Sequence, residues 1–245
     1  MTTAIILAGG LGTRLRDAVP DLPKPMAPVA GRPFLAHQMD HWIGQGIARF
    51  ILSVGYRAAA ISNHFGDRYR GVPVEYAVEA EPLGTGGALL LAAAKLRSAE
   101  PALLLNGDTY FDVSLPALHS LAARRDADWC LALFRHDDAA RYMGVDVAAN
   151  GRIASLRAPA ATHANGGVYW FRPDRLAAAT AGVAAARPQS LENDLLPRLL
   201  AAGQRFAGLL SAGDFIDIGV PSDYRRAADL LPRALLPEPC HAIAR

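Results

Sequence analysis

The chain is poor in cysteine, with only Cys130 and Cys240 among its 245 residues. Neither belongs to a CxxC or CxxH spacing, so the sequence contains no zinc-binding motif, and isolated thiols are typical of a reducing compartment. The N-terminus has no basic segment before its apolar run, residues 4–8, which is too short for a secretory signal or a membrane span. We therefore expect a cytoplasmic protein.

Long runs of one charge sign are also absent. The chain has 25 Lys and Arg against 23 Asp and Glu, a net charge of +2, and its short basic pairs at 124–125 and 225–226 lack interleaved aromatic residues. We expect neither a nucleic-acid partner nor a membrane partner. Hydrophobic residues make up 51% and charged residues 20% of the chain, which excludes disorder and favours a globular protein.

Short apolar runs alternate with helical patterns along the chain. We predict strands from these runs, which are residues 4–8, 50–54, 74–78, 102–105 and 129–134. Alternation of this kind is typical of an α/β fold, and we expect a Rossmann-like, mostly parallel but mixed sheet with helices on both faces.

Three helices have clear signals. The first is predicted between the first two strands and ends near Gly44 and Gly46. The second runs from Gly86 to Leu96, and its N-terminus should direct partial positive charge toward an anion or a polar ring. The third begins after Ser190, a good N-cap, and ends at Gly203.

The stretch from Gly144 to Phe171 has a different pattern, with short runs between Asn and Gly residues. Asn150-Gly151 and Asn165-Gly166-Gly167 are typical of turns, and we expect a small antiparallel insertion appended to the sheet. No linker divides the preceding or following residues. We predict one domain over residues 1–230 and a C-terminal tail over residues 231–245.

A glycine-rich segment, Ala8-Gly9-Gly10-Leu11-Gly12-Thr13-Arg14-Leu15, follows the first predicted strand. Glycines let the backbone approach a ligand and offer N–H donors to phosphate oxygens. A Rossmann motif requires glycine where Leu15 stands, and this disfavours an NAD-dependent oxidoreductase. A P-loop ends in Gly-Lys-Ser/Thr, which is absent here. A tight turn with a solvated Arg14 is the alternative. Pro23-Lys24-Pro25 fixes the backbone of one of the few lysines nearby, which favours a phosphate or nucleotide site.

Five segments carry a resemblance to a known family. They are Leu7 to Leu15 followed by Pro23-Lys24-Pro25-Met26, then Glu81-Pro82-Leu83-Gly84-Thr85-Gly86-Gly87-Ala88, Asn106-Gly107-Asp108, Asn165-Gly166-Gly167-Val168-Tyr169, and Phe215-Ile216-Asp217-Ile218-Gly219. In this order they resemble the sugar-1-phosphate nucleotidyltransferases over most of the chain. The resemblance implies the nucleotide-diphospho-sugar transferase fold and a reaction between a nucleoside triphosphate and a sugar 1-phosphate, with release of pyrophosphate. The family also suggests a homodimer.

The resemblance assigns roles to individual residues. The nucleotide-binding residues would be Ala8, Gly9, Gly10, Gly12, Thr13, Arg14, Glu79, Gly84 and Thr85. The catalytic residues would be Arg14, Lys24 and Asp108, with Lys24 bridging the triphosphate and the sugar phosphate. The sugar phosphate would contact Lys24, Tyr142, Gly144, Asn165, Gly166 and Glu192. Glu192 could instead serve only the dipole of its helix.

Asp108 and Asp217 are predicted to hold Mg²⁺. Asp108 follows an apolar run, and open α/β sheets bind ligands at the carboxyl ends of their strands. Asp217 ends another apolar stretch, and carboxylates from separate strands can share one Mg²⁺. The family places its metal on this pair.

Fewer residues of the sequence indicate which base and which sugar are bound. Glu79 aligns with a Gln of thymidylyl relatives, and a carboxylate suits the two donors of guanine better than the edge of thymine or uracil; an exposed strand-end Glu is the alternative. The motifs most resemble guanylyltransferases of D-glycero-α-D-manno-heptose 1-phosphate, which implies GTP as substrate and a role in lipopolysaccharide, capsule or S-layer glycan synthesis. Mannose 1-phosphate, or UTP or dTTP, are alternative substrates.

Two departures from the family pattern bear on the sugar. A Glu-Lys pair that usually contacts the sugar and its phosphate is replaced by Ser155-Leu156-Arg157-Ala158-Pro159. The usual Tyr-Gly becomes Tyr142-Met143-Gly144. These changes keep open a catalytically weak, nucleotide-binding regulatory homologue, although Arg157 could supply the missing cation.

His37 and His41 lie four residues apart on the first predicted helix. The intervening residues do not match a zinc protease motif, and a third ligand is not evident. We expect both histidines on a solvated helix face.

Overall fold

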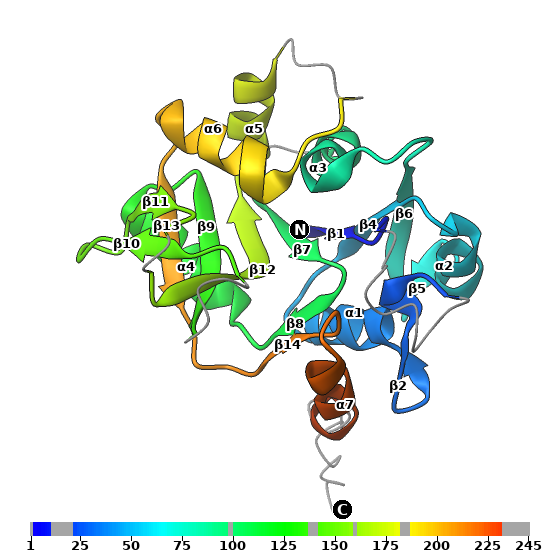
Figure 1. The fold of residues 1–245 in the computed structure, drawn as a ribbon. Helices are drawn as coiled ribbons and strands as arrows, with labels where there is room; N and C mark the ends of the chain where they lie inside the picture. The colour runs from blue at the N-terminus through cyan, green and yellow to red at the C-terminus, as the bar shows by residue number, and fades with distance from the viewer. Residues whose placement is uncertain are drawn as a thin grey trace, which may run out of the picture.

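The computed structural model describes residues 2–10, 22–97, 100–136, 142–158, 161–181 and 187–231. Its centre is an eight-stranded sheet in the order β13-β9-β12-β7-β1-β4-β6-β5 (Figure 1). These strands are β1 (Thr3–Leu7), β4 (Arg49–Val54), β5 (Arg68–Tyr69), β6 (Val72–Val78), β7 (Ala102–Asn106), β9 (Trp129–Arg135), β12 (His163–Phe171) and β13 (Phe206–Leu210). The smaller strands are β2 (Pro28–Val29), β3 (Arg32–Pro33), β8 (Thr109–Phe111), β10 (Val145–Val147), β11 (Ile153–Leu156) and β14 (Phe215–Asp217).

The sheet has a parallel half and a mixed half. In the parallel half, β7, β1, β4 and β6 pair in parallel, and Leu7 lies opposite both Ser53 and Asn106. In the mixed half, β12 runs antiparallel to β7 and β9, while β13 pairs with β9 in parallel. The prediction of a mostly parallel, mixed sheet is confirmed. The parallel register brings the carboxyl ends of β1, β4 and β7 to one edge.

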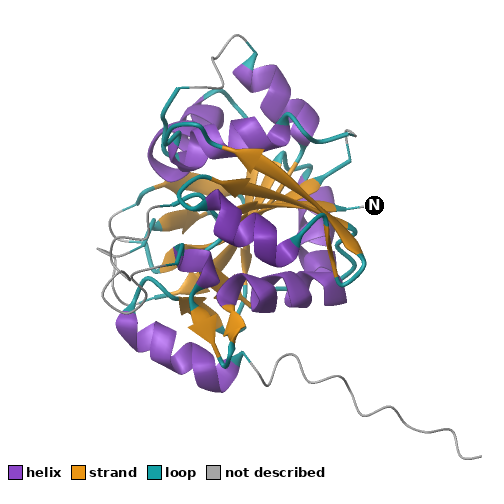
Figure 2. Ribbon diagram, turned by 90° about the vertical axis from the view of Figure 1, so that its right-hand side faces the viewer, coloured by secondary structure: helices purple, strands orange, loops and turns teal. Residues whose placement is uncertain are grey.

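Helices cover both faces of this sheet, as Figure 2 shows. On one face lie α1 (Phe34–Gly44), α2 (Ala58–Phe65) and α4 (Leu115–Arg125), whose apolar side chains join one buried cluster. On the other face lie α3 (Gly84–Ala93), α5 (Pro173–Thr180) and α6 (Leu196–Ala201), the last preceded by a π-helical turn, η3 (Leu191–Leu195). Ser190 caps this turn by accepting the N–H of Asn193 at 3.0 Å, as predicted.

A third buried cluster lies under α7 (Pro221–Leu230), which contacts β14 and β2. It includes Ala27, Phe34, Tyr110, Ile216 and Leu231. This cluster fixes β14 against β8 and so positions the end of β14 beside the central sheet. Leu231, the first residue of the predicted tail, is buried in this cluster, and residues 232–245 lie outside the described residues. Among the described residues, no helix has both the length and the apolarity needed to cross a membrane.

The prediction of a turn at Asn165-Gly166-Gly167 is wrong. These residues lie inside β12, where the pairing register with β9 shifts between Asn165 and Tyr169. Gly167 has a φ of +75°, and a Cβ on Gly166 would overlap the Phe111 ring. The glycines therefore allow an irregularity within a central strand. The second predicted turn is correct, because Asn150-Gly151 connects β10 and β11 as an antiparallel hairpin.

The prediction of a solvated face for His37 and His41 is also wrong. His37 is 2% exposed and its ring Nε2 lies 2.9 Å from the Val29 carbonyl oxygen. His41 packs edge-on against the rings of Trp42 and Tyr110. Burial lowers the pKa of both histidines. The helical spacing of apolar residues correctly predicts α1. That spacing does not reveal the additional layer that α7 and β14 form outside α1.

Candidate active site

A cavity of about 590 Å³ lies at the carboxyl edge of the parallel half. Each of these strands contributes residues at or after its end: Gly9 and Gly10 after β1, Gly55 and Tyr56 after β4, Glu79 to Pro82 after β6, and the last residue of β7, Asn106, with Gly107 and Asp108. Lys24, Pro25, Gly84 and Thr85 complete much of the wall. Of the residues assigned to the nucleotide from sequence, Gly9, Gly10, Glu79, Gly84 and Thr85 therefore line one cavity.

Close backbone approaches shape this edge. The N–H of Gly107 donates to the Leu7 carbonyl at 3.0 Å, and a Cβ on Gly107 would overlap that same carbonyl. A Cβ on Gly9 would overlap the Glu79 carboxylate. Glycine is needed at position 107 because the end of β1 lies too close for a side chain, whereas a side chain at position 9 would have to displace the Glu79 carboxylate.

Glu79 lies in the cavity wall and is half-buried. Its Oε2 accepts the backbone N–H of Leu83 at 3.0 Å, which holds the loop from residue 79 to 83 closed. Its Oε1 lies over Gly9. The carboxylate thus has a fixed position next to Gly9.

The N-terminus of α3 is arranged differently from the sequence expectation. The helix begins at Gly84, and the N–H groups of Gly86 and Gly87 donate to the Gln189 carbonyl oxygen at 2.9 and 3.4 Å. Gly84 has a φ of +67°, and a Cβ there would lie 2.6 Å from the same oxygen. The Gln189 carbonyl therefore accepts two N–H groups of the first turn, while Gly84 and Thr85 of the same turn line the cavity.

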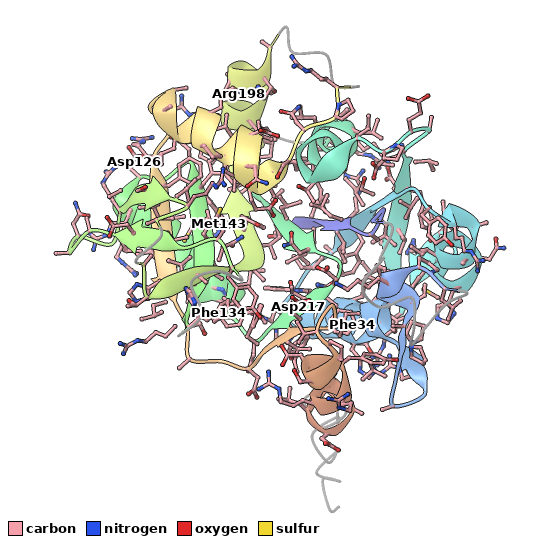
Figure 3. All side chains as sticks on the ribbon, in the orientation of Figure 1. Phe34, Asp126, Phe134, Met143, Arg198 and Asp217 are labelled. Carbon is pink, nitrogen blue, oxygen red and sulfur yellow. The ribbon has the colours of Figure 1, made fainter. Side chains whose placement is uncertain are left out.

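Lys24 extends between two carboxylates. Its Nζ lies 2.5 Å from Asp108 Oδ2 and 3.6 Å from Asp217 Oδ1. The residues come from three places: Lys24 from a 3-10 turn, η2 (Lys24–Met26), Asp108 from the residues after β7, and Asp217 from the end of β14. Figure 3 labels Asp217 near the middle of the view, close to β8 and β14. Strand pairing explains the meeting, because Asp217 lies opposite Thr109, the neighbour of Asp108.

Backbone and side-chain contacts hold both acids. The N–H of Gly219 donates to Asp217 Oδ1 at 2.7 Å, and the N–H of Ile218 donates to the Asp108 carbonyl at 3.0 Å. From α1, the buried Gln38 amide donates to the carbonyls of Asn106 and Thr109 at 2.8 and 2.7 Å. The loop that carries Asp108 is therefore supported from the helix beneath it.

A hydrogen-bonded chain of side chains joins the two halves of the sheet. Thr85 Oγ1 donates to Glu192 Oε2 at 3.1 Å, and the Tyr169 hydroxyl donates to Glu192 Oε1 at 3.2 Å. The hydroxyl in turn accepts Asn165 Nδ2 at 2.5 Å. Tyr169 is fully buried and burial raises its pKa well above the ordinary value, so the hydroxyl keeps its proton. Asn165 and Glu192, both assigned to the sugar phosphate from sequence, are therefore linked through Tyr169.

The remaining predicted residues lie elsewhere. Ala8 is 1% exposed and belongs to the core beneath the cavity. Gly144 forms a bridge with Ala164, and Gly166 packs on Phe111. Tyr142 packs against aromatic rings of β9 and β14. None of these four lines the cavity. Gly12, Thr13 and Arg14 lie outside the described residues.

The segment that replaces the family's Glu-Lys pair is described as far as Ala158. Arg157 is exposed and has a φ of +62°. Ala158 donates its N–H to the Gly144 carbonyl at 3.0 Å. The segment thus packs on the residues that the sequence analysis assigned to the sugar.

Sequence reasoning missed several residues of the site. Gly55 and Tyr56 line the cavity directly after β4, and the rule that ligands bind at strand carboxyl ends would have found them. Tyr169 and Gly219 lie within quoted motifs but received no role, because their contacts with Glu192 and Lys24 join residues distant in the chain. Gln38 has no local signal in the sequence.

Comparison with known proteins identifies the family of this chain. The nucleotidyl transferase family profile matches residues 3–233. D-glycero-alpha-D-manno-heptose 1-phosphate guanylyltransferase from Aneurinibacillus thermoaerophilus is 39% identical over 91% of this chain and 96% of its own length. The protein of the same name from Campylobacter jejuni is 36% identical over 90% of this chain and 96% of its own length.

Solved structures extend the likeness to the fold. HddC from Yersinia pseudotuberculosis superposes with a TM-score of 0.80 at 31% identity, over 94% of this chain and 99% of that one. HddC has also been solved in complex with GMP-PN. The fold and the family expected from sequence are confirmed, and the chain belongs to the nucleotidyl transferase family.

Proposed function

We propose that this protein is a sugar-1-phosphate guanylyltransferase, which joins GTP to a sugar 1-phosphate and releases pyrophosphate. D-glycero-α-D-manno-heptose 1-phosphate is the sugar we favour, because relatives named for that activity match over nearly the whole chain. The observation that carries the proposal is the meeting of Lys24, Asp108 and Asp217 beside a cavity that Gly9, Gly10 and Glu79 line.

The proposed reaction needs positioning and charge neutralisation more than covalent chemistry. A phosphate oxygen of the sugar 1-phosphate attacks the α-phosphorus, and the bond from that phosphorus to the bridging oxygen breaks as pyrophosphate leaves. Two anions must approach each other for this step. The Lys24 ammonium at the cavity wall is suited to reduce their repulsion.

Mg²⁺ is part of the proposal, held by Asp108 and Asp217. These side chains offer only oxygen ligands and already face one cation, the Lys24 ammonium, which fits the preference of Mg²⁺ for one or two carboxylates with substrate phosphates. When bound, Mg²⁺ would neutralise charge on the phosphates. Among the described residues, no group of three or more His, Cys, Asp or Glu side chains could hold a metal.

Glu79 is proposed to recognise the base. Its carboxylate can accept hydrogen bonds from N1–H and the amino group of guanine, whereas thymine and uracil present one donor flanked by acceptors. The fixed position of Glu79 beside Gly9 supports this role. For the sugar phosphate, we propose Asn165 and Glu192, which share the Tyr169 hydroxyl.

The test is pyrophosphate release by purified protein with Mg²⁺. GTP, ATP, CTP, UTP and dTTP are each assayed against manno-heptose, mannose and glucose 1-phosphates. Release with GTP and the manno-heptose supports the proposal in full. Release with another pair changes the substrates but keeps the reaction class.

A regulatory homologue is the second candidate, favoured by the missing Glu-Lys pair at residues 155–159. It predicts GTP binding without pyrophosphate release for every pair in the same assay.

We also propose that the enzyme is cytoplasmic and homodimeric. Light scattering after gel filtration tests the homodimer, and fractionation of cells tests the location.

A further inference from the structure

The chain has only two lysines, Lys24 and Lys95. The Lys24 ammonium lies between the carboxylates of Asp108 and Asp217, at 2.5 and 3.6 Å. The Lys24 side chain is 11% exposed, and those of Asp108 and Asp217 are 40% and 16% exposed. In this partly buried setting, the ammonium balances one of two negative charges.

The backbone around Lys24 is fixed, so only the side chain can move. Pro23 and Pro25 flank it, and Pro25 and Met26 are buried. The N–H of Ala27 donates to the Lys24 carbonyl at 3.0 Å. Any displacement of the ammonium must come from rotation about the side-chain bonds of Lys24.

Gly219 makes the space in which the ammonium lies. A Cβ on Gly219 would overlap Lys24 Nζ and would lie 2.8 Å from Asp217 Oδ1. The N–H of Gly219 holds that carboxylate oxygen at 2.7 Å. The site for a cation between the two acids is therefore already formed, and Lys24 is the cation that the chain itself supplies.

An ammonium and a divalent cation cannot both lie between the same oxygens. Mg²⁺ binds carboxylate oxygens at about 2.1 Å, and the repulsion between two cations this close is strong in a partly buried site. We propose that Lys24 is the resident cation of the Asp108–Asp217 pair in the free protein, and that a divalent cation replaces it and releases the ammonium into the cavity.

This inference rests on the proposed metal site. It adds that the divalent cation must displace the Lys24 ammonium before the ammonium can reach the cavity. The released ammonium would move toward the cavity that Lys24 already lines together with Gly9 and Gly10, where the proposed function places phosphate groups. Metal binding and the availability of Lys24 to phosphate are thus coupled. The free protein should bind divalent cations weakly because it must first displace its own.

The first test measures Mn²⁺ binding by electron paramagnetic resonance, without nucleotide. Lys24→Met removes the competing charge but keeps a long side chain, and should bind Mn²⁺ about tenfold more tightly than the wild type or better. Lys95→Met is the matched control and should bind as the wild type does. Equal or weaker binding by Lys24→Met would overturn the inference.

Asp217→Asn separates this inference from the proposed function. Loss of Mn²⁺ binding in Asp217→Asn, without tightening in Lys24→Met, would leave the metal site standing and reject the exchange. Wild-type affinity in Asp217→Asn would reject the metal site itself.

A second test observes the wild-type protein and needs a variant, at a position away from the site, only to assign its signals. Protein containing lysine labelled with ¹³C at Cε gives two lysine signals, and Lys95→Arg identifies the one that belongs to Lys24. Addition of Mg²⁺ alone should shift the Lys24 signal and leave that of Lys95 in place. A Lys24 signal that stays fixed while Mn²⁺ binding is saturated contradicts the exchange.

Discussion

The parallel half and the mixed half of the sheet contribute to the candidate site by different means. The parallel half offers backbone and short loops, because each of its strands ends at the same edge and the following residues reach the cavity. The mixed half offers side chains linked through the buried Tyr169 hydroxyl. Substrate discrimination on the parallel side should therefore depend on single residues. On the mixed side it should depend on the group of side chains that are hydrogen-bonded through Tyr169.

The largest effect is expected where the two halves meet. Asp108→Asn should lower the turnover of the proposed reaction by about three orders of magnitude, because loss of one carboxylate charge weakens the hold on a metal that neutralises phosphate. Steady-state pyrophosphate release measures this. Asp229→Asn, an exposed position on α7, is the control and should keep full activity. Near-normal turnover of Asp108→Asn would remove Asp108 from the metal site.

A single position on the parallel side should control the base. Glu79→Gln keeps an oxygen that can accept the Leu83 N–H but loses the charge, and should lower kcat/KM for GTP by about tenfold to a hundredfold. Glu81→Gln, which changes another acid of the cavity wall, should leave kcat/KM for GTP within about twofold, as is usual where no such contact is lost. If both variants behave alike, Glu79 does not read guanine.

The connected set on the mixed side should respond as a unit. Tyr169→Phe removes the hydroxyl between Asn165 and Glu192, and should raise KM for the sugar phosphate about tenfold while KM for GTP changes little. Tyr76→Phe removes a hydroxyl that donates to the Gly66 carbonyl away from the cavity, and serves as control. Equal changes in both KM values would show that Tyr169 supports the whole site instead of the sugar side.

The smallest expected effect is on the pH dependence of the free energy of unfolding, which should also differ between the two halves of the sheet. In α1, against the parallel half, burial lowers the pKa of His37 below its ordinary value of 6.5. The unfolded chain then binds more protons than the folded one below pH 6.5, so the free energy of unfolding falls as the pH drops, by at most about 1.4 kcal/mol per pH unit for each such group. His37→Gln should reduce this loss between pH 7 and 5.5 in urea unfolding, whereas His64→Gln, at an exposed position, should not.

The mixed half should respond only at lower pH. Burial raises the pKa of Asp128, but hydrogen bonds from the backbone and guanidinium of Arg205 lower it further, so that the net value lies below the ordinary 3.8. Its contribution to stability is complete above pH 3.8 and is lost as the pH falls below that value. Asp128→Asn should therefore show the wild-type change in stability between pH 7 and 5.5. A changed slope in this range would contradict the prediction that Asp128 contributes to the pH dependence only at lower pH.

The difference between the halves also decides what the sequence could predict. Gly9, Lys24 and Asp108 lie next to apolar runs or between prolines, so local patterns locate them, and parallel pairing brings their neighbours to one edge. The link from Thr85 to Glu192 spans 107 positions, and its centre, Tyr169, has the appearance of an ordinary strand residue. Such contacts depend on the tertiary arrangement alone.

Local patterns misled where tertiary packing overrides them. Asn165-Gly166-Gly167 has the composition of a turn, yet pairing with β7 and β9 on both sides keeps β12 inside the sheet. His37 has the composition of a solvated helix face, yet the Val29 carbonyl and the layer under α7 cover it. In both cases the deciding contact comes from a segment that the sequence does not mark as a neighbour.

The contact between α3 and the Gln189 carbonyl also bears on protein engineering. The first residues of α3 belong to the parallel side and Gln189 precedes Glu192, so a direct contact between two peptide groups sets the distance between the proposed base subsite and the proposed sugar subsite. Because Gly84, Gly86 and Gly87 leave no room for a methyl group against residues 83 and 187–190, this separation cannot be adjusted by a change of rotamer. Attempts to widen the substrate range should vary the walls of the cavity and treat these three glycines as a fixed spacer.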